Sequence, residues 1–234
     1  MTLARFHVPE VGPGGRVTLP EGSAHHAREV LRLRAGDLIR VFDGRGAEFE
    51  ATLDRVTRHE VHARIGAAVS PRPESPLRIT LALSPLKGDR MELVVQKATE
   101  LGVAAIRPVV TFRTDAAARP ALRGTRQERW EKVASGAAEQ CGRAVVPDVA
   151  VTVALDRLVA EAHEGERVLL LETPGQPPRD LLLLVGPAGG FEPAEVEMLQ
   201  AAGFLVAALG PRVLRSETAA VAAVAVAQAT WGDI

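Results

Sequence analysis

Two glycine-containing turns near the C-terminal end carry residue types suited to holding a small ligand. The first, Val185–Phe191, reads Val-Gly-Pro-Ala-Gly-Gly-Phe and follows an apolar run. Adjacent glycines let the backbone turn tightly and approach a ligand without a Cβ in the way. Glu192 and Glu195, which come next, would repel a phosphate, whereas a cationic ligand such as a sulfonium would tolerate them. The glycines alone also fit an ordinary strand-to-helix turn.

The second turn, Leu209–Ala219, reads Leu-Gly-Pro-Arg-Val-Leu-Arg-Ser-Glu-Thr-Ala. Its Gly-Pro pair forces a turn, Ser216 is suited to cap a following helix, and Glu217 favours the helix dipole. Arg212 and Arg215 lack such a structural reason, because arginines between an apolar strand and an alanine-rich helix are costly unless they meet anions or bases. A functional and a structural role both stay open for these two arginines.

The elements that would position these turns form an alternating pattern after residue 77, which predicts a mostly parallel sheet covered by helices on both faces. Strands are expected over residues 79–83, 104–110, 149–151, 167–171, 181–185 and 204–209, and helices over 88–101, 125–141, 155–162, 193–202 and 216–231. The Gly-Pro turns would then lie between a strand and a helix.

The N-terminal part has a different sequence pattern, in which turn-forming residues separate short segments typical of strands. Apolar and polar residues alternate over Leu38–Phe42 and Ala47–Leu53, as in strands with one wet face. We expect a small β-barrel, interrupted by one helix at Ala24–Leu33 after Ser23 as its cap.

A proline-rich segment separates these two parts of the chain. Three prolines fall within Ser70–Pro76, a density that neither a helix nor a central strand accepts. The predicted organisation is a barrel domain over residues 1–70, a linker over 71–76 and an α/β domain over 77–234.

Composition excludes several classes of protein. The chain has 234 residues, of which 47% are hydrophobic, enough to build a sizeable core. Cys141 is the single cysteine, which excludes a disulfide within the chain and fits a reducing, cytoplasmic location. No apolar run approaches the roughly 20 residues that span a bilayer, so we expect no membrane role. No acidic or thiolate partner stands at ligand spacing from His7, His25, His26, His59 or His62, so we expect no metal.

The charge is unevenly distributed, although the formal net charge is only -1. Residues 1–72, 73–143 and 144–234 carry net charges of +2, +4 and -7. A polyanion would therefore meet the first two thirds of the chain.

Taken together, the two turns resemble motifs of the ribosomal RNA small-subunit methyltransferase E family, which belongs to the SPOUT class. The resemblance rests on strand–Gly-Pro-x-Gly-Gly-Phe–helix followed by Leu-Gly-x-Arg-x-Leu-Arg-x-Glu-Thr-Ala. Three further segments agree in order and spacing: Arg5-Phe6, Gln96–Gly102 and Glu139–Arg143. The family usually has Glu where this chain has Ala188, so no role of that carboxylate is carried over.

The resemblance implies a PUA-like β-barrel followed by a SPOUT α/β domain with a C-terminal trefoil knot, and a homodimer whose active sites are completed by the partner chain. The helix Ala219–Ala229 is a candidate for the dimer contact, and equally a candidate for a buried core helix. The implied cofactor is S-adenosyl-L-methionine. The positions that match its binding loops are Leu171, Glu172, Thr173, Gly186, Pro187, Gly189, Gly190, Leu209, Gly210, Val213, Leu214 and Thr218.

The implied reaction is methylation of N3 of one uridine in 16S ribosomal RNA, during ribosome biogenesis. An arginine near the uracil oxygens would stabilise the ring anion, and Arg215 is the first candidate, with Glu217 a weaker candidate for the base. The residues expected to bind RNA are Arg5, Arg28, Arg32, Arg34, Lys97, Gln140 and Arg143.

Two alternatives stay open. A related SPOUT methyltransferase acting on another nucleotide would carry much the same cofactor loops. A non-catalytic RNA-binding protein of ribosome assembly would keep the fold without the activity. A Rossmann-type oxidoreductase is a poor third, because the dinucleotide fingerprint is missing.

Overall fold

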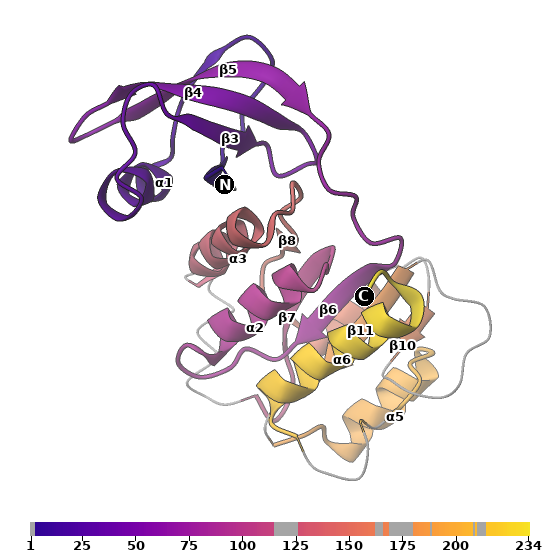
Figure 1. The fold of residues 1–234 in the computed structure, drawn as a ribbon. Helices are drawn as coiled ribbons and strands as arrows, with labels where there is room; N and C mark the ends of the chain where they lie inside the picture. The colour runs from indigo at the N-terminus through magenta and orange to yellow at the C-terminus, as the bar shows by residue number, and fades with distance from the viewer. Residues whose placement is uncertain are drawn as a thin grey trace. The chain divides into compact units, whose positions relative to one another are not determined.

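The computed structural model describes residues 3–114, 126–161, 166–168, 180–187, 189–207, 209 and 214–234. The chain divides into two compact units, whose elements are labelled in Figure 1. Unit 1 comprises Met1–Glu74 and Ser135–Val146, and unit 2 comprises Ser75–Ala134 and Pro147–Ile234. Helix α3 (Gln127–Cys141) therefore contributes residues to both units.

Unit 1 is built on a curled five-stranded sheet. Its strands are β1 (Arg5–His7), β2 (Arg16–Thr18), β3 (Leu38–Phe42), β4 (Glu48–Val56) and β5 (Val61–Val69), in the order β1-β3-β4-β5-β2. β1 runs parallel to β3 and the other pairs are antiparallel. The register between β4 and β5 shifts twice, between Phe49 and Ala51 and between Leu53 and Arg55. Such bulges bend strands and increase their twist, which accounts for the curl.

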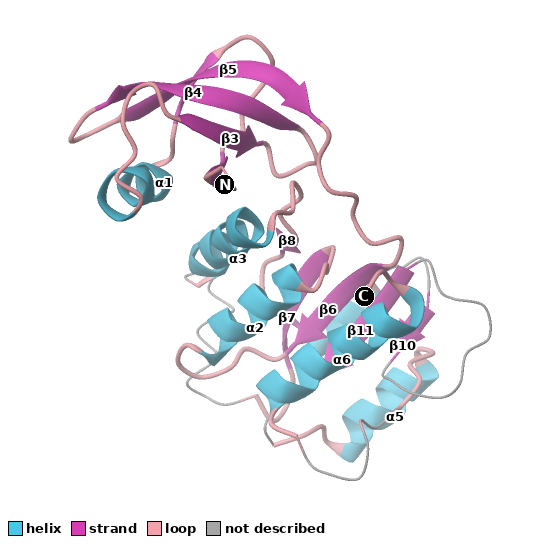
Figure 2. Cartoon of the chain, viewed as in Figure 1, coloured by secondary structure: helices cyan, strands magenta, loops and turns pink. Residues whose placement is uncertain are grey.

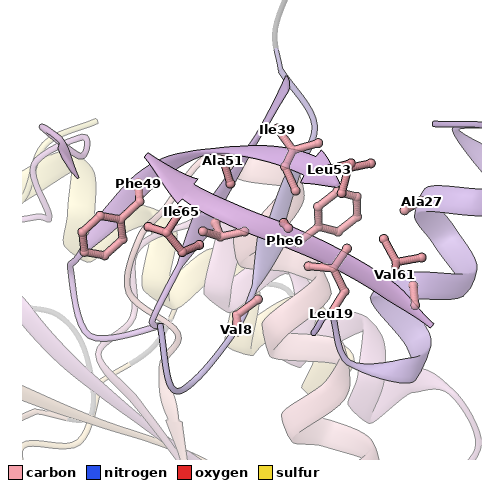
Figure 3. Packing of buried hydrophobic residues seen from close by; sticks show 13 residues of the cluster. Phe6, Val8, Leu19, Ala27, Ile39, Phe49, Ala51, Leu53, Val61 and Ile65 are labelled. Carbon is pink, nitrogen blue, oxygen red and sulfur yellow. The ribbon is translucent and has the colours of Figure 1, made fainter. Parts of the chain in front are cut away.

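The core of unit 1 gathers along the strands of this sheet (Figure 3). Alternate residues of each strand point into it, as the period of two requires, for example Phe49, Ala51 and Leu53 of β4. Phe6 of β1 is fully buried there. Each large apolar side chain buried in this way contributes roughly 2 kcal/mol to stability.

The helix expected over Ala24–Leu33 begins and ends three residues earlier, and its second half is π-helical. Helix α1 (Glu21–His25) follows Pro20, and a π-helical turn η1 (His26–Val30) continues it directly. Pro20, rather than Ser23, occupies the cap position. Beyond η1, Arg32 has a left-handed φ of 55°, which ends the helical conformation because an L-residue there cannot continue a right-handed helix.

Residues 135–146 belong to unit 1, although the sequence-based boundary assigned them to the α/β domain. Ala138 and Ala144 pack against Phe42 of β3. The backbone adds two hydrogen bonds, from Val146 N–H to the Gly44 carbonyl (3.0 Å) and from Gly46 N–H to the Ala144 carbonyl (3.2 Å). These apolar and backbone contacts explain why residues 135–146 belong to unit 1. They join residues that are far apart in the sequence, so the sequence did not reveal them.

Unit 2 contains the predicted parallel sheet. Its strands are β6 (Arg78–Leu83), β7 (Ala105–Val110), β8 (Asp148–Val149), β9 (Val153–Ala154), β10 (Glu166–Val168) and β11 (Asp180–Val185). The order is β10-β11-β6-β7-β8, with β9 also pairing with β7, and every pair is parallel. The carboxyl ends of β6, β7 and β11 therefore meet at one edge of the sheet.

Helices cover both faces of this sheet, as predicted. On one face, α4 (Leu155–Ala160) and α5 (Pro193–Ala201) pack through Leu158 and Leu199 against Leu182 and Leu184 of β11. On the other, α6 (Ser216–Trp231) lies on β6 and β11 beside α2 (Arg90–Glu100), as Figure 2 shows. The buried residues of α6 include Ala220, Ala223, Val224 and Ala227, the spacing that one helix face requires.

Of the strand expected over Phe204–Leu209, the described residues show a β-bridge at Leu205, and residue 208 lies outside them. Gly203, with a φ of 85°, reverses the chain after α5. Phe204 then donates its N–H to the Leu199 carbonyl (3.0 Å) and packs into the α5 cluster. Gly203 and Phe204 thus form the C-terminal cap of α5, where the expected strand begins.

Candidate functional site

Three loops meet where β6, β7 and β11 end. They begin with Ser84, Thr111 and Gly186, the residues that directly follow the three strands. Open parallel sheets bind ligands at this edge, outside the carboxyl ends of the strands. The first glycine-containing turn of the sequence is therefore placed where a ligand site is expected.

The glycine loop, defined as residues 186–191, has a fixed shape in its described part. A Cβ built on Gly186 would come within 2.8 Å of the Phe191 ring, so this position requires glycine. Gly190 has a φ of 73° and donates its N–H to the Pro187 carbonyl (2.9 Å). Pro187 is buried, whereas Gly189 is exposed. Ala188, where the family usually has Glu, lies outside the described residues.

Helix α5 begins with a capping box that uses both acidic residues. Glu192 is the cap, and its side chain accepts a hydrogen bond from the backbone of the third helical residue. Glu195 returns the contact by accepting the N–H of Glu192 (2.8 Å). Because these carboxylates occupy the first turn, the helix start is closed to a phosphate, as the sequence indicated.

Arg113, which sequence reasoning missed, joins the loop after β7 to the glycine loop. Its Nη1 donates to the Gly189 carbonyl (2.7 Å) and its Nε donates to the Glu192 carboxylate (2.6 Å). The hydrogen bond to Glu192 raises the pKa of Arg113 above its ordinary value. The neighbouring Phe112 N–H donates to the Glu195 carboxylate (2.6 Å). The only signal in the sequence was the position of this arginine directly after an apolar strand.

Buried hydroxyl groups fix the loop after β7. Thr114 accepts the Thr111 N–H at its side-chain oxygen (2.8 Å), and its hydroxyl lies 3.2 Å from that of Ser84. Ser84 in turn donates its hydroxyl to the Val109 carbonyl (3.0 Å) and its N–H to the Val185 carbonyl (3.2 Å). The ends of β6, β7 and β11 are thus tied together by side-chain and backbone hydrogen bonds.

The described end of the second predicted turn, at the start of α6, lies near the start of α2. Arg90, which opens α2 after β6, lies 3.9 Å from the Glu217 carboxylate in the first turn of α6. Arg215 is the cap of α6, its side chain is exposed, and its carbonyl accepts the Ala219 N–H (2.8 Å). Ser216, expected as the cap, is instead the first helical residue and is buried.

Several predicted cofactor positions cannot be placed. Leu171, Glu172, Thr173, Gly210 and Val213 lie outside the described residues, as does Arg212. Leu209 and Leu214 are partly buried, and Thr218 is exposed on α6.

Arg5, expected to bind RNA, is instead a structural residue of unit 1. Its side chain is 9% exposed and pairs with Glu48, which is 3% exposed, at 3.0 Å. The guanidinium also donates to the carbonyls of Ala138 (3.1 Å) and Arg143 (3.2 Å), and it lies over the Phe42 ring. All of its nitrogens are occupied, so Arg5 has no free donor for a phosphate.

The other predicted RNA-binding residues differ in their surroundings. Arg28 pairs with Glu29, Lys97 pairs with Glu100, and Arg143 pairs with Glu74. Arg32, Arg34 and Gln140 are exposed. Val30 and Leu31, at 61% and 42% exposed, give the segment around Arg32 an apolar component as well.

Among the described residues, His, Cys, Asp and Glu side chains form no group of three that could hold a metal ion. None of the helices described in unit 1 or unit 2 is long and apolar enough to cross a membrane.

Two domain families match the chain. The RNA methyltransferase domain family matches residues 73–228, and the RNA methyltransferase PUA domain family matches residues 19–66. The matched ranges together span most of the sequence.

Full-length relatives agree with this assignment. The ribosomal RNA small subunit methyltransferase E of Synechocystis is 33% identical over 222 residues, with 89% of this chain and 71% of the relative covered. That of Mycobacterium bovis is 31% identical, with 95% and 90% covered.

Solved structures extend the likeness to three dimensions. A methyltransferase from Legionella pneumophila, solved with the cofactor SAM, is 38% identical with a TM-score of 0.90, and each chain is covered completely. A ribosomal RNA small subunit methyltransferase E from Neisseria gonorrhoeae, bound to S-adenosyl methionine, is 34% identical with a TM-score of 0.89 and 99% of each chain covered. The chain therefore belongs to the ribosomal RNA small subunit methyltransferase E family.

Proposed function

We propose that this protein uses S-adenosylmethionine to methylate N3 of a specific uridine in 16S ribosomal RNA. The observation that carries the proposal is the glycine loop at the carboxyl edge of the sheet, in a chain that matches the cofactor-bound Legionella structure over its whole length. The activity is thus assigned from the site and from the family together.

The residues of the glycine loop fit such a cofactor. Gly189 and Gly190 carry no side chain of their own, which lets Arg113 pack against them, and Gly186 keeps the Phe191 ring close to the strand end. The acidic start of α5 closes that helix to phosphates and tolerates a positive charge. Gly186, Pro187, Gly189 and Gly190 would hold the cofactor from this side, together with the second turn and the segment around Glu172.

The catalytic contribution of the chain would lie at the start of α6. When bound, S-adenosylmethionine supplies a methyl group on a positively charged sulfur. N3 of uridine carries a proton and is paired in duplexes, so the base must be unpaired and lose that proton to react. The exposed Arg215 is suited to stabilise the negative charge on the ring oxygens. Glu217, which faces Arg90, is the weaker candidate for accepting the proton.

The RNA would be held by basic residues that keep their donors free for phosphates. Arg32 and Arg34 of unit 1 are exposed and stand next to exposed apolar residues, a combination suited to phosphates and unstacked bases. Gln140 is exposed as well. RNA binding by the three paired residues would require each to exchange its carboxylate partner for a phosphate; these residues are Arg28, Lys97 and Arg143.

A homodimer and a trefoil knot complete the proposal. Ala220, Ala223, Val224 and Ala227 of α6 are buried within the chain, while Val226 on the same helix is 37% exposed and would reach a partner. Sedimentation equilibrium tests the dimer. The knot would involve residues outside those described and stays a prediction.

The test is incubation of purified protein with methyl-labelled S-adenosylmethionine and small ribosomal subunits that lack the modification. We expect label on N3 of one uridine of the 16S RNA, located by nucleoside mass spectrometry and primer extension. Label on another nucleotide would favour a different methyltransferase of the same class. Absence of both cofactor binding and label would favour a non-catalytic assembly protein.

A further inference from the structure

We propose that Arg113 is a positioning residue, which holds the glycine loop in the shape that the cofactor binds. The inference rests on the proposed cofactor, because it assigns Arg113 to the same site. It adds a residue from the loop after β7, a segment to which neither the family motifs quoted above nor the glycine pattern pointed.

The contacts of Arg113 reach both halves of the loop. One nitrogen holds the Gly189 carbonyl at 2.7 Å, and another holds the Glu192 carboxylate at 2.6 Å. The stem of Arg113 also lies against Gly189, because a Cβ built there would meet the Arg113 Cβ at 3.3 Å. A single side chain therefore fixes the exposed Gly189 and the N-cap residue of α5.

A glycine loop needs this kind of support. Glycine has the largest backbone freedom of any residue, so a loop with two adjacent glycines loses much entropy when it is ordered. If the loop is already ordered before binding, that cost does not reduce cofactor affinity. Arg113 supplies this order by packing on the side of Gly189 where a Cβ would otherwise stand.

The base of Arg113 is itself rigid, which the role requires. Its neighbour Phe112 is held through its N–H by Glu195 (2.6 Å). On the other side, Thr114 is buried and hydrogen-bonded to Thr111 and Ser84. The guanidinium thus extends from a fixed backbone to the glycine loop, whose two adjacent glycines give it much conformational freedom.

Only arginine matches both acceptors at once. The guanidinium presents several N–H groups in a rigid fork, whereas the lysine ammonium is a point charge on a flexible stem. Arg113→Lys should therefore keep the charge and one of the two contacts. Its cofactor affinity should lie above that of Arg113→Ala.

The experiment measures S-adenosylmethionine binding by calorimetry and methyl transfer at varied cofactor concentration. For Arg113→Ala we expect Kd and the cofactor KM to rise about tenfold, the order of one lost charge-assisted hydrogen bond, while kcat at saturating cofactor stays within about threefold. Arg113→Lys should lie between this variant and the parent. Hydrogen exchange of the Gly190 amide, which bonds to the Pro187 carbonyl, should be faster in Arg113→Ala without any ligand.

Arg78→Ala is the matched control. Arg78 pairs with Asp180 at 3.6 Å, and both residues lie at the amino ends of β6 and β11, far along the strands from the glycine loop. The substitution therefore removes an ion pair of an arginine with a carboxylate without touching the loop. Its Kd and Gly190 exchange should equal those of the parent. If the parent binds cofactor and Arg113→Ala binds equally well, the positioning role is overturned. If the parent binds none, the proposed function fails, and unchanged Gly190 exchange would then overturn the ordering role separately.

Discussion

The guanidinium of Arg5 donates to Glu48 and to main-chain carbonyls of residues more than 130 positions away. At the scale of single residues, such burial decides which charged groups remain available for a ligand. The sequence placed Arg5 among the RNA-binding residues because it lies in the basic first part of the chain and in a segment that agrees with the family. It could not reveal the acceptors, because they come from residues 138–143, which reach β1 only in the folded protein.

Replacing Arg5 with alanine should lower the free energy of unfolding by about 3 kcal/mol, because it removes the nearer partner of the buried Glu48 carboxylate, which keeps Arg40 at 3.7 Å. Arg16→Ala is the control, since its pair with Asp54 is 69% exposed on the arginine side and should cost less than about 1 kcal/mol. Urea denaturation measures both. Weakened RNA binding by folded Arg5→Ala, at unchanged stability, would contradict the structural role.

Glu139 gives a pH-dependent prediction. Burial raises the pKa of its carboxyl above the ordinary value of 4.5, although hydrogen bonds from His7 and Ser23 oppose the shift. A carboxyl with a raised pKa in the folded state destabilises the fold as pH rises from 4.5 to that pKa, and by a constant amount above it. Glu139→Gln should therefore gain stability relative to the parent over this interval and level off at higher pH.

Thermal unfolding of both proteins between pH 4 and pH 8 tests this prediction. A difference between Glu139→Gln and the parent that stays flat with pH, or that grows toward acid, would exclude a raised pKa at Glu139.

Arg215 is the residue on which the proposed chemistry depends. Because its side chain is exposed and its backbone carbonyl already caps α6, Arg215→Ala should leave folding and cofactor binding intact. Methyl transfer should fall by about a hundredfold or more, as when a charge-stabilising donor is removed. Single-turnover assays measure this loss, and unchanged turnover would remove Arg215 from the mechanism.

At the scale of elements, regular periodicity was a better guide than loop chemistry. The range of α6 follows from its start after the Gly-Pro turn and its alanine-rich apolar face, and the structure has it at Ser216–Trp231. The π-helical turn at His26–Val30 gave no signal, because a wider turn needs no special residue. Likewise, the apolar run after Gly203 did not reveal that Phe204 caps α5. The ordering of the glycine loop by Arg113 depends on two loops meeting in space.

Gly190 and Gly203 offer a matched pair of substitutions that test whether the glycine loop binds the cofactor. Both have left-handed φ values, 73° and 85°, so an alanine at either should cost about 1 kcal/mol of stability. Only Gly190 lies in the glycine loop, whereas a Cβ on Gly203 would meet nothing within 4 Å. We expect Gly190→Ala to weaken cofactor binding and Gly203→Ala to leave it unchanged, as measured by calorimetry. Equal affinity of the two variants would separate Gly190 from the site.

At the scale of the whole molecule, charge is divided between the ends of the chain. The excess of basic residues lies before residue 144 and the acidic excess after it. This division matches an RNA-facing part and a part that holds a cationic cofactor, and it was visible in the sequence. Which arginines remain free was not visible, because pairing depends on the fold.

RNA affinity should fall steeply with salt, because phosphate contacts release counterions. Changing Arg32 and Arg34 together to glutamine should weaken binding and reduce the salt slope by about two, since both side chains are exposed. Filter binding to small-subunit RNA at several salt concentrations measures the slope. Arg16→Gln, in the same unit, is the control, and an equal reduction by that variant would argue against a specific surface.

Because helix α3 contributes to both units, no single cut divides this chain into two complete parts. Cleavage after Glu74 would strip the N-terminal fragment of Ala138 and Ala144, which cover Phe42. The same fragment would also lose the carbonyls that receive Arg5. Exchange of the N-terminal part between relatives should therefore succeed only when residues 135–146 travel with it.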